Sequence, residues 1–579
     1  MKKLFRFLKD YKKESFLAPF FKLLEAVFDL LVPIVIRFIV NDGIGKGNKT
    51  LIWQLSLLMV GFGVLGLICA VIAQYFAAKA AVGFATGLRS ALFSHIQKLS
   101  YSETDRIGTS TLITRMSSDI NQLQNGVNMV LRLFLRSPII VFGSMIAAFL
   151  INTRAGTVFA VTIPVLAVVV FGIMLGTIPL YRKVQSLLDR VTGVTRENLN
   201  GVRVVRAFNK EKEETEAFRR ANEANTGMQN FVGKISALMN PLTYAILNLG
   251  VVVLMQVCSL EISNGTGLTD GDVLALYNYM GQILVELIKL ANTIFTVTKA
   301  AACGSRISSV LDLPVGMETL PLKGENVDKS GARVRFNHAS IAYGGAAEES
   351  LSDIELTARP GDTVGIIGGT GSGKTTLVNL IPRFYDVTRG HVYVDGQDVR
   401  TYDTETLRQK IGVVPQKAVL FKGTIRSNLL WGNDKATDEE LWAALDTAQA
   451  KEFVEAKPGG LDAPVEQNGR NFSGGQRQRL TIARALVRRP EILILDDSAS
   501  ALDFATDAKL RKALRSLDYS PTVFIISQRT SSIRSADHIL VLDDGRTVGA
   551  GTHDELLRDC PVYEEIHSSQ YKKEGGMRA

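Results

Sequence analysis

The chain has 579 residues, of which 46% are hydrophobic and 21% are charged, so it is too long for one domain and is not disordered, collagen-like or a disulfide-rich scaffold. Its four cysteines (Cys69, Cys258, Cys303 and Cys560) are far apart and form no CxxC pair, which argues against a disulfide framework and a cysteine-rich zinc site. The net charge of +9 suits nucleic-acid binding or a membrane protein with excess Lys and Arg on its cytoplasmic side, and the apolar composition favours the second class.

Six apolar stretches in the first 300 residues predict membrane-spanning helices. Each supplies roughly the 20 apolar residues that a helix needs to cross the hydrocarbon. The stretch from Thr157 to Pro179 contains no charged residue, which would be very unusual in a buried helix of a soluble protein. The predicted spans are residues 16–40, 52–78, 130–152, 155–181, 238–262 and 269–297.

The connections between these stretches predict how the chain is oriented in the membrane. The links after the first, third and fifth stretches are short, whereas the second and fourth are followed by long charged links at 79–130 and 181–237. Lys and Arg are concentrated in the long links and at the N-terminus, so the positive-inside rule places these links and both chain ends in the cytoplasm. Their helical periodicity predicts antiparallel helical arms that reach roughly 35–40 Å below the membrane.

A stretch rich in Gly and Lys, near residues 314–331, marks the boundary between two domains. We expect a transmembrane domain at 1–312, a linker at 313–330 and a soluble domain at 331–579. The soluble domain begins with ARVRFNHASIAY, whose alternation of apolar and polar residues predicts a strand.

Residues 363–376, TVGIIGGTGSGKTT, match the phosphate-binding pattern G-x-x-x-x-G-K-[ST] between an apolar strand and a helix-like run. Glycines allow backbone N–H groups to approach phosphate oxygens, Lys374 pairs with the outer phosphates, and Thr375 offers its hydroxyl group to Mg²⁺. A glycine-rich turn without function is the competing interpretation, but the flanking strand and helix argue against it. The predicted nucleotide-binding residues of this loop are Gly368, Gly369, Thr370, Gly371, Ser372, Gly373, Lys374, Thr375 and Thr376.

A second acidic element, EILILDD, ends in Asp496 and Asp497. An apolar run of this kind predicts a buried parallel strand, which delivers its terminal carboxylates to the sheet edge where nucleotides bind. An ordinary strand-end aspartate is the simplest interpretation of this segment in isolation. Beside the phosphate loop, the segment instead predicts that Asp496 orients the Mg²⁺ shell through water.

Between these two elements lies NFSGGQRQRLTIARAL, and here the sequence resembles the nucleotide-binding domain of ATP-binding cassette (ABC) transporters. The matching motifs follow the family's order along the chain. The resemblance implies that ATP is the ligand, that Tyr343 stacks on adenine, and that Gln416 in VVPQKAVLF contacts the nucleotide and Mg²⁺. The other motifs are the signature residues Ser473, Gly474, Gly475 and Gln476, the strand end Asp496 and Asp497, and the D-loop Ser500, Ala501, Leu502 and Asp503.

The resemblance extends to the first half of the chain. Six spans followed by one ABC domain correspond to a half-transporter of the exporter type, and SETDRIGTSTLITRMSSDI and RENLNGVRVVRAFNKEKEE resemble the family's intracellular loops. The implied fold is an all-α six-helix transmembrane domain with long cytoplasmic helical arms, followed by an α/β P-loop nucleotide-binding domain. The implied function is ATP-driven export of a hydrophobic small molecule, lipid or peptide. By analogy the membrane is a bacterial inner membrane, with the ABC domain in the cytoplasm and no nucleic-acid partner.

The family holds each ATP between two such domains, and this implies a dimer. The Ser473 hydroxyl and the N–H groups that follow it would bind the γ-phosphate of ATP held by the partner chain. One chain therefore cannot assemble a complete site.

Two positions depart from the family pattern. Asp497 stands where the family usually has the glutamate that polarises the attacking water, and a displacement of about 1 Å can lower a rate on the order of a hundredfold. Gln528, in TVFIISQRTSSI, stands where the family usually has a histidine that contacts the γ-phosphate. Together they favour the degenerate subunit of a heterodimeric exporter whose partner supplies Glu and His. A homodimer with slow hydrolysis is the alternative.

Polar side chains within the predicted spans indicate an internal cavity, because charges in hydrocarbon are costly. We expect an i, i+3 ion pair between Lys22 and Glu25, and Glu286 is the best candidate for a residue that lines the cavity. An ATP-gated channel or regulator is an alternative on the same scaffold, whereas six spans argue against a membrane-anchored soluble ATPase. The polar residues are Lys22, Glu25, Asp29, Arg37, Asn248, Gln256, Asn278, Gln282, Glu286, Lys289 and Asn292.

Overall fold

The chain divides into two compact units. The first comprises Met1–Gln97 and Thr109–Leu313, and the second comprises Lys98–Gly108 and Pro314–Ala579. Residues 318 and 322–326 of the predicted linker lie outside the described part of the chain. The computed structural model describes residues 3–265, 267–317, 319–321, 327–344 and 348–571.

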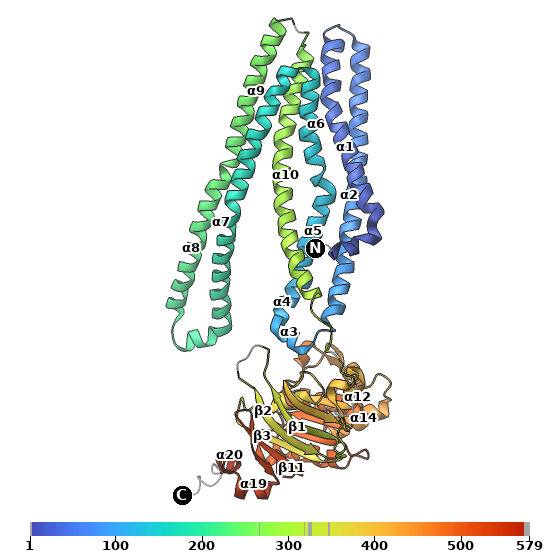
Figure 1. Cartoon of the computed structure of the whole chain (residues 1–579), viewed down its shortest axis with the longest axis vertical. Helices are drawn as coiled ribbons and strands as arrows, with labels where there is room; N and C mark the ends of the chain where they lie inside the picture. The colour runs from blue at the N-terminus through green and yellow to red at the C-terminus, as the bar shows by residue number, and fades with distance from the viewer. Residues whose placement is uncertain (1–2, 266, 318, 322–326, 345–347, 572–579) are drawn as a thin grey trace. The chain divides into compact units, whose positions relative to one another are not determined.

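The first unit is built from long helices that pack along one another (Figure 1). The long helices are α1 (Lys12–Phe38), α2 (Lys49–Ile96), α6 (Arg136–Ile151), α7 (Thr153–Ala207), α8 (Glu211–Ala237), α9 (Met239–Ser263) and α10 (Asp270–Leu311). The shorter helical segments are η1 (Leu4–Tyr11), η2 (Ile39–Ile44), α4 (Thr109–Thr114), η3 (Arg115–Asp119), α5 (Ile120–Met129) and η4 (Val130–Phe134).

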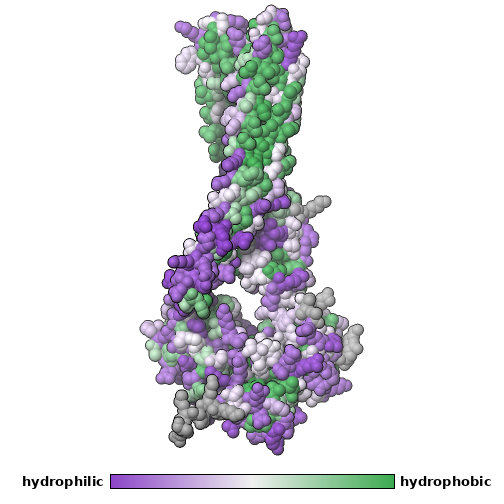
Figure 2. Space-filling view, turned by 90° about the vertical axis from the view of Figure 1, so that its left-hand side faces the viewer, coloured by the Kyte–Doolittle hydropathy of each residue, from purple (hydrophilic) through white to green (hydrophobic). Residues whose placement is uncertain are grey.

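Five helical stretches of the described chain are long and apolar enough to cross a membrane. They correspond to the second to sixth predicted spans. The first predicted span, 16–40, lies largely in α1. Lys22, Glu25 and Asp29 interrupt its apolar sequence, so α1 is long enough but not apolar enough to be counted with the five. An apolar band covers part of this helical unit (Figure 2). The five stretches are Lys49–Ile96, Thr109–Ile151, Thr153–Ala207, Glu211–Ser263 and Asp270–Leu311.

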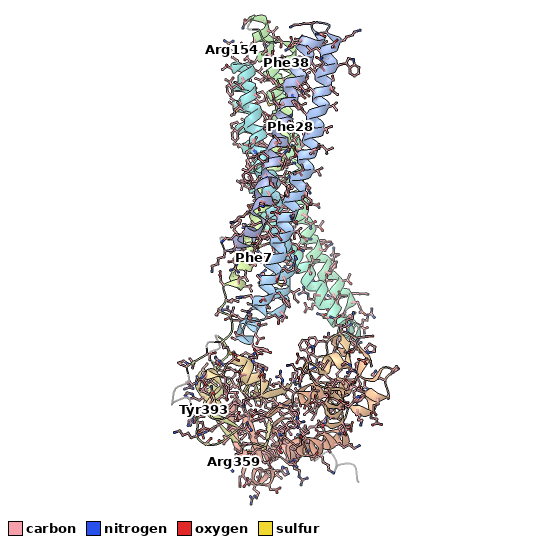
Figure 3. All side chains as sticks on the ribbon, turned by 90° about the vertical axis from the view of Figure 1, so that its right-hand side faces the viewer. Phe7, Phe28, Phe38, Arg154, Arg359 and Tyr393 are labelled. Atoms are coloured by element: carbon pink, nitrogen blue, oxygen red, sulfur yellow. The ribbon has the colours of Figure 1, made fainter. Side chains whose placement is uncertain are left out.

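The ends of the helices agree with the predicted topology. Phe38 near the end of α1 and Arg154 near the start of α7 lie at the same end of the helical unit, whereas Phe7 lies farther along it (Figure 3). Asn152 caps α7 by accepting a hydrogen bond from the Ala155 N–H. The short links after the first and third spans therefore lie at one end of the helical unit, as the predicted topology requires.

The second long link folds as the predicted antiparallel arm. α7 has 55 residues, so at 1.5 Å per residue it is about 80 Å long and extends well beyond a hydrocarbon layer about 30 Å thick. α8 packs back along α7. The first long link also folds back on itself, because α5 packs along α2, where Arg89 donates to Asn121 Oδ1 at 3.1 Å. In addition, α5 packs against α10.

The second unit contains a six-stranded sheet in the order β12-β11-β3-β10-β9-β6. Only β12 is antiparallel to its neighbour among these described strands. Since parallel strands end at the same edge, β3 and β9 deliver their carboxyl ends to one side of the sheet, with β10 between them. The strands are β3 (Thr363–Gly368), β6 (Ile411–Val414), β9 (Ile492–Asp496), β10 (Thr522–Ile526), β11 (His538–Asp543) and β12 (Arg546–Gly551).

A four-stranded antiparallel sheet, in the order β2-β1-β4-β5, packs against the first sheet through a buried apolar cluster. Phe336 and Ile354 from this sheet meet Val364 and Ile366 of β3 in that cluster. The strand predicted at ARVRFNHASIAY is confirmed as β1. The remaining strands are β1 (Val334–Ile341), β2 (Leu351–Ala358), β4 (Arg389–Val394), β5 (Gln397–Asp398), β7 (Gly423–Thr424) and β8 (Pro464–Val465).

Helices surround the sheets of the second unit, and the predicted fold class is confirmed: an all-α transmembrane domain with helical arms and an α/β nucleotide-binding domain. The helices are α3 (Tyr101–Ile107), α11 (Lys374–Leu380), α12 (Thr404–Gln409), α13 (Ile425–Leu429), α14 (Asp438–Thr447), α15 (Lys451–Glu455), α16 (Gly474–Val487), α17 (Phe504–Arg515), α18 (Thr530–Ile533), α19 (His553–Asp559) and α20 (Pro561–Tyr571). The short 3₁₀ turns are η6 (Val399–Thr401), η7 (Gly460–Asp462) and η8 (Gln467–Gly469).

Candidate nucleotide-binding site

The loop between β3 and α11 has a backbone that only glycine accommodates readily. Gly371 and Gly373 have φ angles of +86° and +92°, in the left-handed region that disfavours residues with a Cβ atom. A Cβ atom on Gly368 would lie 2.1 Å from the Leu542 carbonyl oxygen. The loop therefore keeps a bare backbone, which suits close approach of phosphate oxygens.

Lys374 points its ammonium group back into this loop. Its Nζ donates hydrogen bonds to the Gly368 carbonyl oxygen at 3.0 Å and to Ser372 Oγ at 3.3 Å. Burial lowers the pKa of Lys374, although the nearby carboxylates of Asp497 and Asp496 oppose that shift. Neutral oxygen atoms thus hold a half-buried cation, which is a suitable partner for an anionic phosphate.

Thr375 and Asp496 meet where β9 ends beside the loop. The Thr375 hydroxyl donates to both carboxylate oxygens of Asp496, at 3.2 and 3.1 Å. Asp496 is buried, and burial raises its pKa, with the Asp497 charge adding to the shift and the Thr375 hydrogen bond opposing it. Hydroxyl and carboxylate oxygens are the ligands that Mg²⁺ prefers, so this pair fits the predicted metal position.

Asp497 and Gln416 lie on the neighbouring side of the site. Gln416 Nε2 is 3.5 Å from Asp497 Oδ2, which brings the predicted Q-loop residue to the strand end. Asp497 has a φ angle of +45°, and its N–H donates to the Ile526 carbonyl oxygen of β10. A backbone strain of about 1–2 kcal/mol is typical of such a conformation, and burial raises the pKa of the Asp497 carboxyl group.

Gln528 follows β10 closely and its side chain is exposed. Its carbonyl oxygen accepts a hydrogen bond from Gln570 Nε2 at 2.7 Å, which ties this position to α20. Because β10 lies between β3 and β9, Gln528 is placed next to the sheet edge at which the loop and Asp496 meet.

Tyr343 reaches the helix that follows the phosphate loop. Its hydroxyl donates to Thr376 Oγ1 at 3.0 Å, and its ring meets the ring of Tyr385 edge to face, with centroids 5.0 Å apart. The predicted adenine-stacking residue therefore lies beside the loop that is predicted to hold the phosphates.

The signature segment starts a separate helix. Ser473 caps α16, with its Oγ accepting from the Gln476 N–H while Gln476 Oε1 accepts from the Ser473 N–H. A Cβ atom on Gly475 would lie 3.0 Å from the Ala501 carbonyl oxygen, so the signature and the D-loop are in close contact. Asp503 caps α17 by accepting from the Thr506 N–H. Within the described chain no hydrogen bond joins this segment to the phosphate loop.

The sequence prediction missed a contact between the second unit's core and residues 98–108 of the first long link. Tyr385 donates its hydroxyl hydrogen to Asp105 Oδ2 at 2.6 Å, and Tyr101 of α3 packs on Phe384 with ring centroids 4.5 Å apart. Burial, followed by the Asp105 hydrogen bond, raises the pKa of Tyr385. The aromatic pair Phe384-Tyr385 just after α11 was the available signal in the sequence.

The polar residues of the predicted spans occupy several positions in the first unit. Lys22 and Glu25 form the predicted ion pair, with Nζ and Oε2 2.6 Å apart. Glu286 lines a cavity as predicted, together with Asp29, Asn248, Asn278, Gln282 and Lys289. Arg37 pairs with Asp272. Arg136, which also lines the cavity, was missed although it lies within the predicted span 130–152, because its partners Glu286 and Asp29 are far away in the sequence.

Known proteins match both halves of the chain. Residues 15–287 match the family described as ABC transporter transmembrane region, and residues 351–500 match the family described as ABC transporter. An uncharacterized ABC transporter ATP-binding protein of Mycobacterium tuberculosis (strain ATCC 25618 / H37Rv) is 40% identical over 566 residues, which cover 97% of each chain. The ATP-dependent lipid A-core flippase of Desulfotalea psychrophila (strain LSv54 / DSM 12343) is 33% identical over 484 residues, which cover 83% of this chain and 84% of the flippase.

A solved structure shares the fold. It is described as a bacterial Atm1-family ABC exporter with ATP bound, and it matches with a TM-score of 0.80 and 24% sequence identity. The match covers 97% of this chain and 98% of that chain, so both units have counterparts in one polypeptide.

Proposed function

Since this chain belongs to the ABC transporter family, with a transmembrane region and an ATP-binding region on one polypeptide, we propose that it is one half of a dimeric exporter that moves a hydrophobic or amphipathic substrate across a bacterial inner membrane. ATP binding and hydrolysis drive the transport. The second half is a different chain, and this chain binds ATP at a degenerate site while it completes the hydrolytic site of its partner.

The arrangement of the phosphate loop supports ATP binding with Mg²⁺. Lys374 neutralises the outer phosphates, and the bare backbone around Gly371 and Gly373 donates N–H groups to them. Thr375, Asp496 and Gln416 would hold Mg²⁺, with Asp496 acting through water. Bound Mg²⁺ supplies positive charge that offsets the charge developing on the phosphates.

The contrast between two parts of the chain carries the proposal of asymmetry. Asp497 and Gln528 are poorly suited to prepare an attacking water, because Asp497 is one methylene shorter than glutamate and Gln528 cannot take up a proton. Ser473 and Gly474, by contrast, are exposed at the start of α16, where a second chain can reach them. This chain therefore keeps the signature residues that its partner's site needs and lacks the glutamate and histidine that its own site needs.

Chain-specific nucleotide analysis tests the proposal. The chain is tagged, purified from membranes of its native host with whatever it assembles with, and labelled with a photoreactive ATP analogue after one round of hydrolysis. We expect two different chains, with uncleaved nucleotide on this chain and diphosphate on its partner. A single type of chain with equal hydrolysis at both sites would instead support the slow homodimer.

A further inference from the structure

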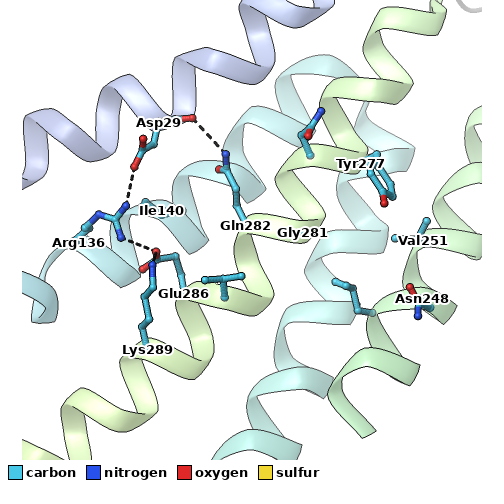
Figure 4. Close-up of a pocket in the computed structure, with 13 residues that line it drawn as sticks. Asp29, Arg136, Ile140, Asn248, Val251, Tyr277, Gly281, Gln282, Glu286 and Lys289 are labelled. Atoms are coloured by element: carbon cyan, nitrogen blue, oxygen red, sulfur yellow. Dashed lines mark hydrogen bonds and ion pairs between the residues drawn. The ribbon is translucent and has the colours of Figure 1, made fainter. Parts of the chain in front are cut away.

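The helices α1, α6, α9 and α10 of the first unit enclose a cavity of about 430 Å³ (Figure 4). Arg136 and Asp29 lie at one wall, and Glu286 and Lys289 follow one another along α10. Apolar side chains complete the lining, among them Ile140, Leu247 and Val251. The cavity thus combines an apolar wall with a group of charged side chains within the part of the chain expected to be in the membrane.

The charged side chains form one continuous network. Arg136 donates to Glu286 Oε1 at 2.6 Å and to Asp29 Oδ2 at 2.7 Å, and Lys289 Nζ lies 3.0 Å from Glu286 Oε1. Ser137 donates to the second Glu286 oxygen at 2.7 Å. Arg136 Nε also lies 3.7 Å from Glu25 Oε1, and Glu25 pairs with Lys22. The network is therefore electrically balanced, with three positive and three negative groups, which limits the cost of placing it in hydrocarbon.

The middle of the network is buried and its two ends are open. The side chains of Arg136 and Glu286 are only 11% and 4% exposed, whereas those of Asp29 and Lys289 are 42% and 44% exposed. Asp29 uses one carboxylate oxygen for Arg136, and Lys289 uses one of its three donors for Glu286. The cavity therefore presents one carboxylate and one ammonium group, held apart by the buried Arg136–Glu286 pair.

Gln282 adds a polar group between these ends. Its Nε2 donates to the Asp29 carbonyl oxygen at 3.4 Å, while its Oε1 is buried and has no hydrogen-bond partner among the described residues. A buried acceptor without a partner costs free energy, which a donor on a bound molecule would recover. The cavity is thus incomplete as a polar site on its own.

We propose that this cavity binds an amphipathic substrate with a zwitterionic head, whose cationic group pairs with Asp29, whose anionic group pairs with Lys289, and whose apolar part lies along Ile140, Leu247 and Val251. A purely cationic head meets Lys289 and a purely anionic head meets Asp29, so each gains one attraction and suffers one repulsion. A zwitterion gains both attractions. This assignment rests on the proposed export function, because it names the class of molecule that the exporter carries.

Equilibrium binding tests the inference without any hydrolysis step. The assembled transporter is placed in lipid nanodiscs without nucleotide and titrated with dodecylphosphoethanolamine, dodecylammonium and dodecyl methyl phosphate, which share one alkyl chain, below their critical micelle concentrations. We expect the zwitterion to bind about tenfold more tightly than either singly charged compound, as one additional charge-assisted hydrogen bond predicts. Equal affinities for the three compounds, or no binding of any of them, would overturn the inference.

Two variants assign the preference to this cavity. Asp29→Asn should abolish the higher affinity of the zwitterion relative to the anionic compound. Lys289→Met should abolish its higher affinity relative to the cationic compound. Lys299→Met is the matched control, since Lys299 lies on the same helix but over the Phe295 ring and outside the cavity lining. An unchanged preference in both cavity variants would place the binding elsewhere and overturn the inference.

The outcome separates this inference from the proposed function. Zwitterion binding that requires Asp29 and Lys289, without ATP-dependent movement of the compound, would contradict export and leave the binding site in place. ATP-dependent transport of other substrates, without any head-group preference in the binding assay, would support export and overturn the site.

Discussion

Among the residues that the structure describes, only neutral oxygen atoms of its own loop accept hydrogen bonds from Lys374, so its partner in the working protein should be the nucleotide. We predict that Lys374→Ala lowers the affinity for ATP at this chain's site roughly tenfold to a hundredfold, because hydrogen bonds to charged groups contribute about 1.5–3 kcal/mol. Binding of a fluorescent ATP analogue measures the effect. Lys451→Ala, at an exposed lysine that begins α15, is the matched control. Unchanged affinity in Lys374→Ala would contradict the assignment of the loop.

The Tyr343 ring and its hydroxyl group can be tested separately. Stacking requires only the ring, so Tyr343→Phe should bind ATP about as tightly as the original chain, although it loses the hydrogen bond to Thr376. Tyr343→Ala should lose about 1 kcal/mol of binding free energy, or roughly fivefold in affinity. Titration with ATP and with a triphosphate that lacks the base separates the two contributions. Equal large losses in both variants would assign the role to the hydroxyl group.

At the scale of residues, the sequence predicted those positions whose spacing is set by one continuous motif. The loop from Gly368 to Thr376 and the strand end at Asp496 are of this kind, because the local backbone alone places them. Arg136 and Tyr385 escaped prediction, since their partners Glu286 and Asp105 are far away in the sequence. Only tertiary packing brings such pairs together.

The short helix α3 is the element through which the first long link meets the ABC domain's core. Tyr385 donates to Asp105, and Tyr101 packs on Phe384, while Tyr385 also touches the Tyr343 ring. A series of aromatic side chains in contact thus leads from the predicted adenine position to a segment that continues into the transmembrane helices. Movement at one end of this aromatic series should change the position of the other end.

We therefore predict that Tyr385→Phe weakens the coupling between substrate and ATP hydrolysis. The variant keeps the ring contact with Tyr343 but loses the hydrogen bond to Asp105, a bond to a charged acceptor worth about 1.5–3 kcal/mol. We expect unchanged ATP affinity and a several-fold smaller stimulation of ATPase activity by transported substrate. Tyr393→Phe, on β4, is the control. Full stimulation in Tyr385→Phe would show that the Asp105 contact does not transmit the signal.

Elements were predicted well where one physical pattern dominates a segment. The charge-free stretch within α7 and the alternating strand β1 both appear as expected. The first long link was predicted as an antiparallel helical pair, and α5 does pack along α2, but it also packs against α10. Amphipathic periodicity identifies a helix without identifying the surface on which its apolar face packs.

At the scale of the whole molecule, the chain's two contributions to ATP hydrolysis should be unequal. Asp497 belongs to this chain's own site, whereas Ser473 faces outward at the start of α16 and would complete the partner's site. We predict that Asp497→Asn lowers the ATP turnover of the assembled dimer by no more than about threefold, whereas loss of a working general base costs about 10²–10⁴-fold. Ser473→Ala should lower turnover about a hundredfold or more, as removal of a fixed donor to developing phosphate charge does.

A second variant at Ser473 separates the loss of its hydroxyl group from the loss of helix stability. Ser473 is also the N-cap of α16, and its replacement by Ala costs about 1 kcal/mol of helix stability, whereas replacement by Gly costs only a few tenths. Ser473→Gly should therefore lose turnover as severely as Ser473→Ala if the hydroxyl group acts on the partner's nucleotide. Steady-state ATPase and thermal unfolding of the same purified dimers separate the two effects. If Asp497→Asn abolishes turnover while both Ser473 variants retain it, this chain carries the working base and the proposed asymmetry is wrong.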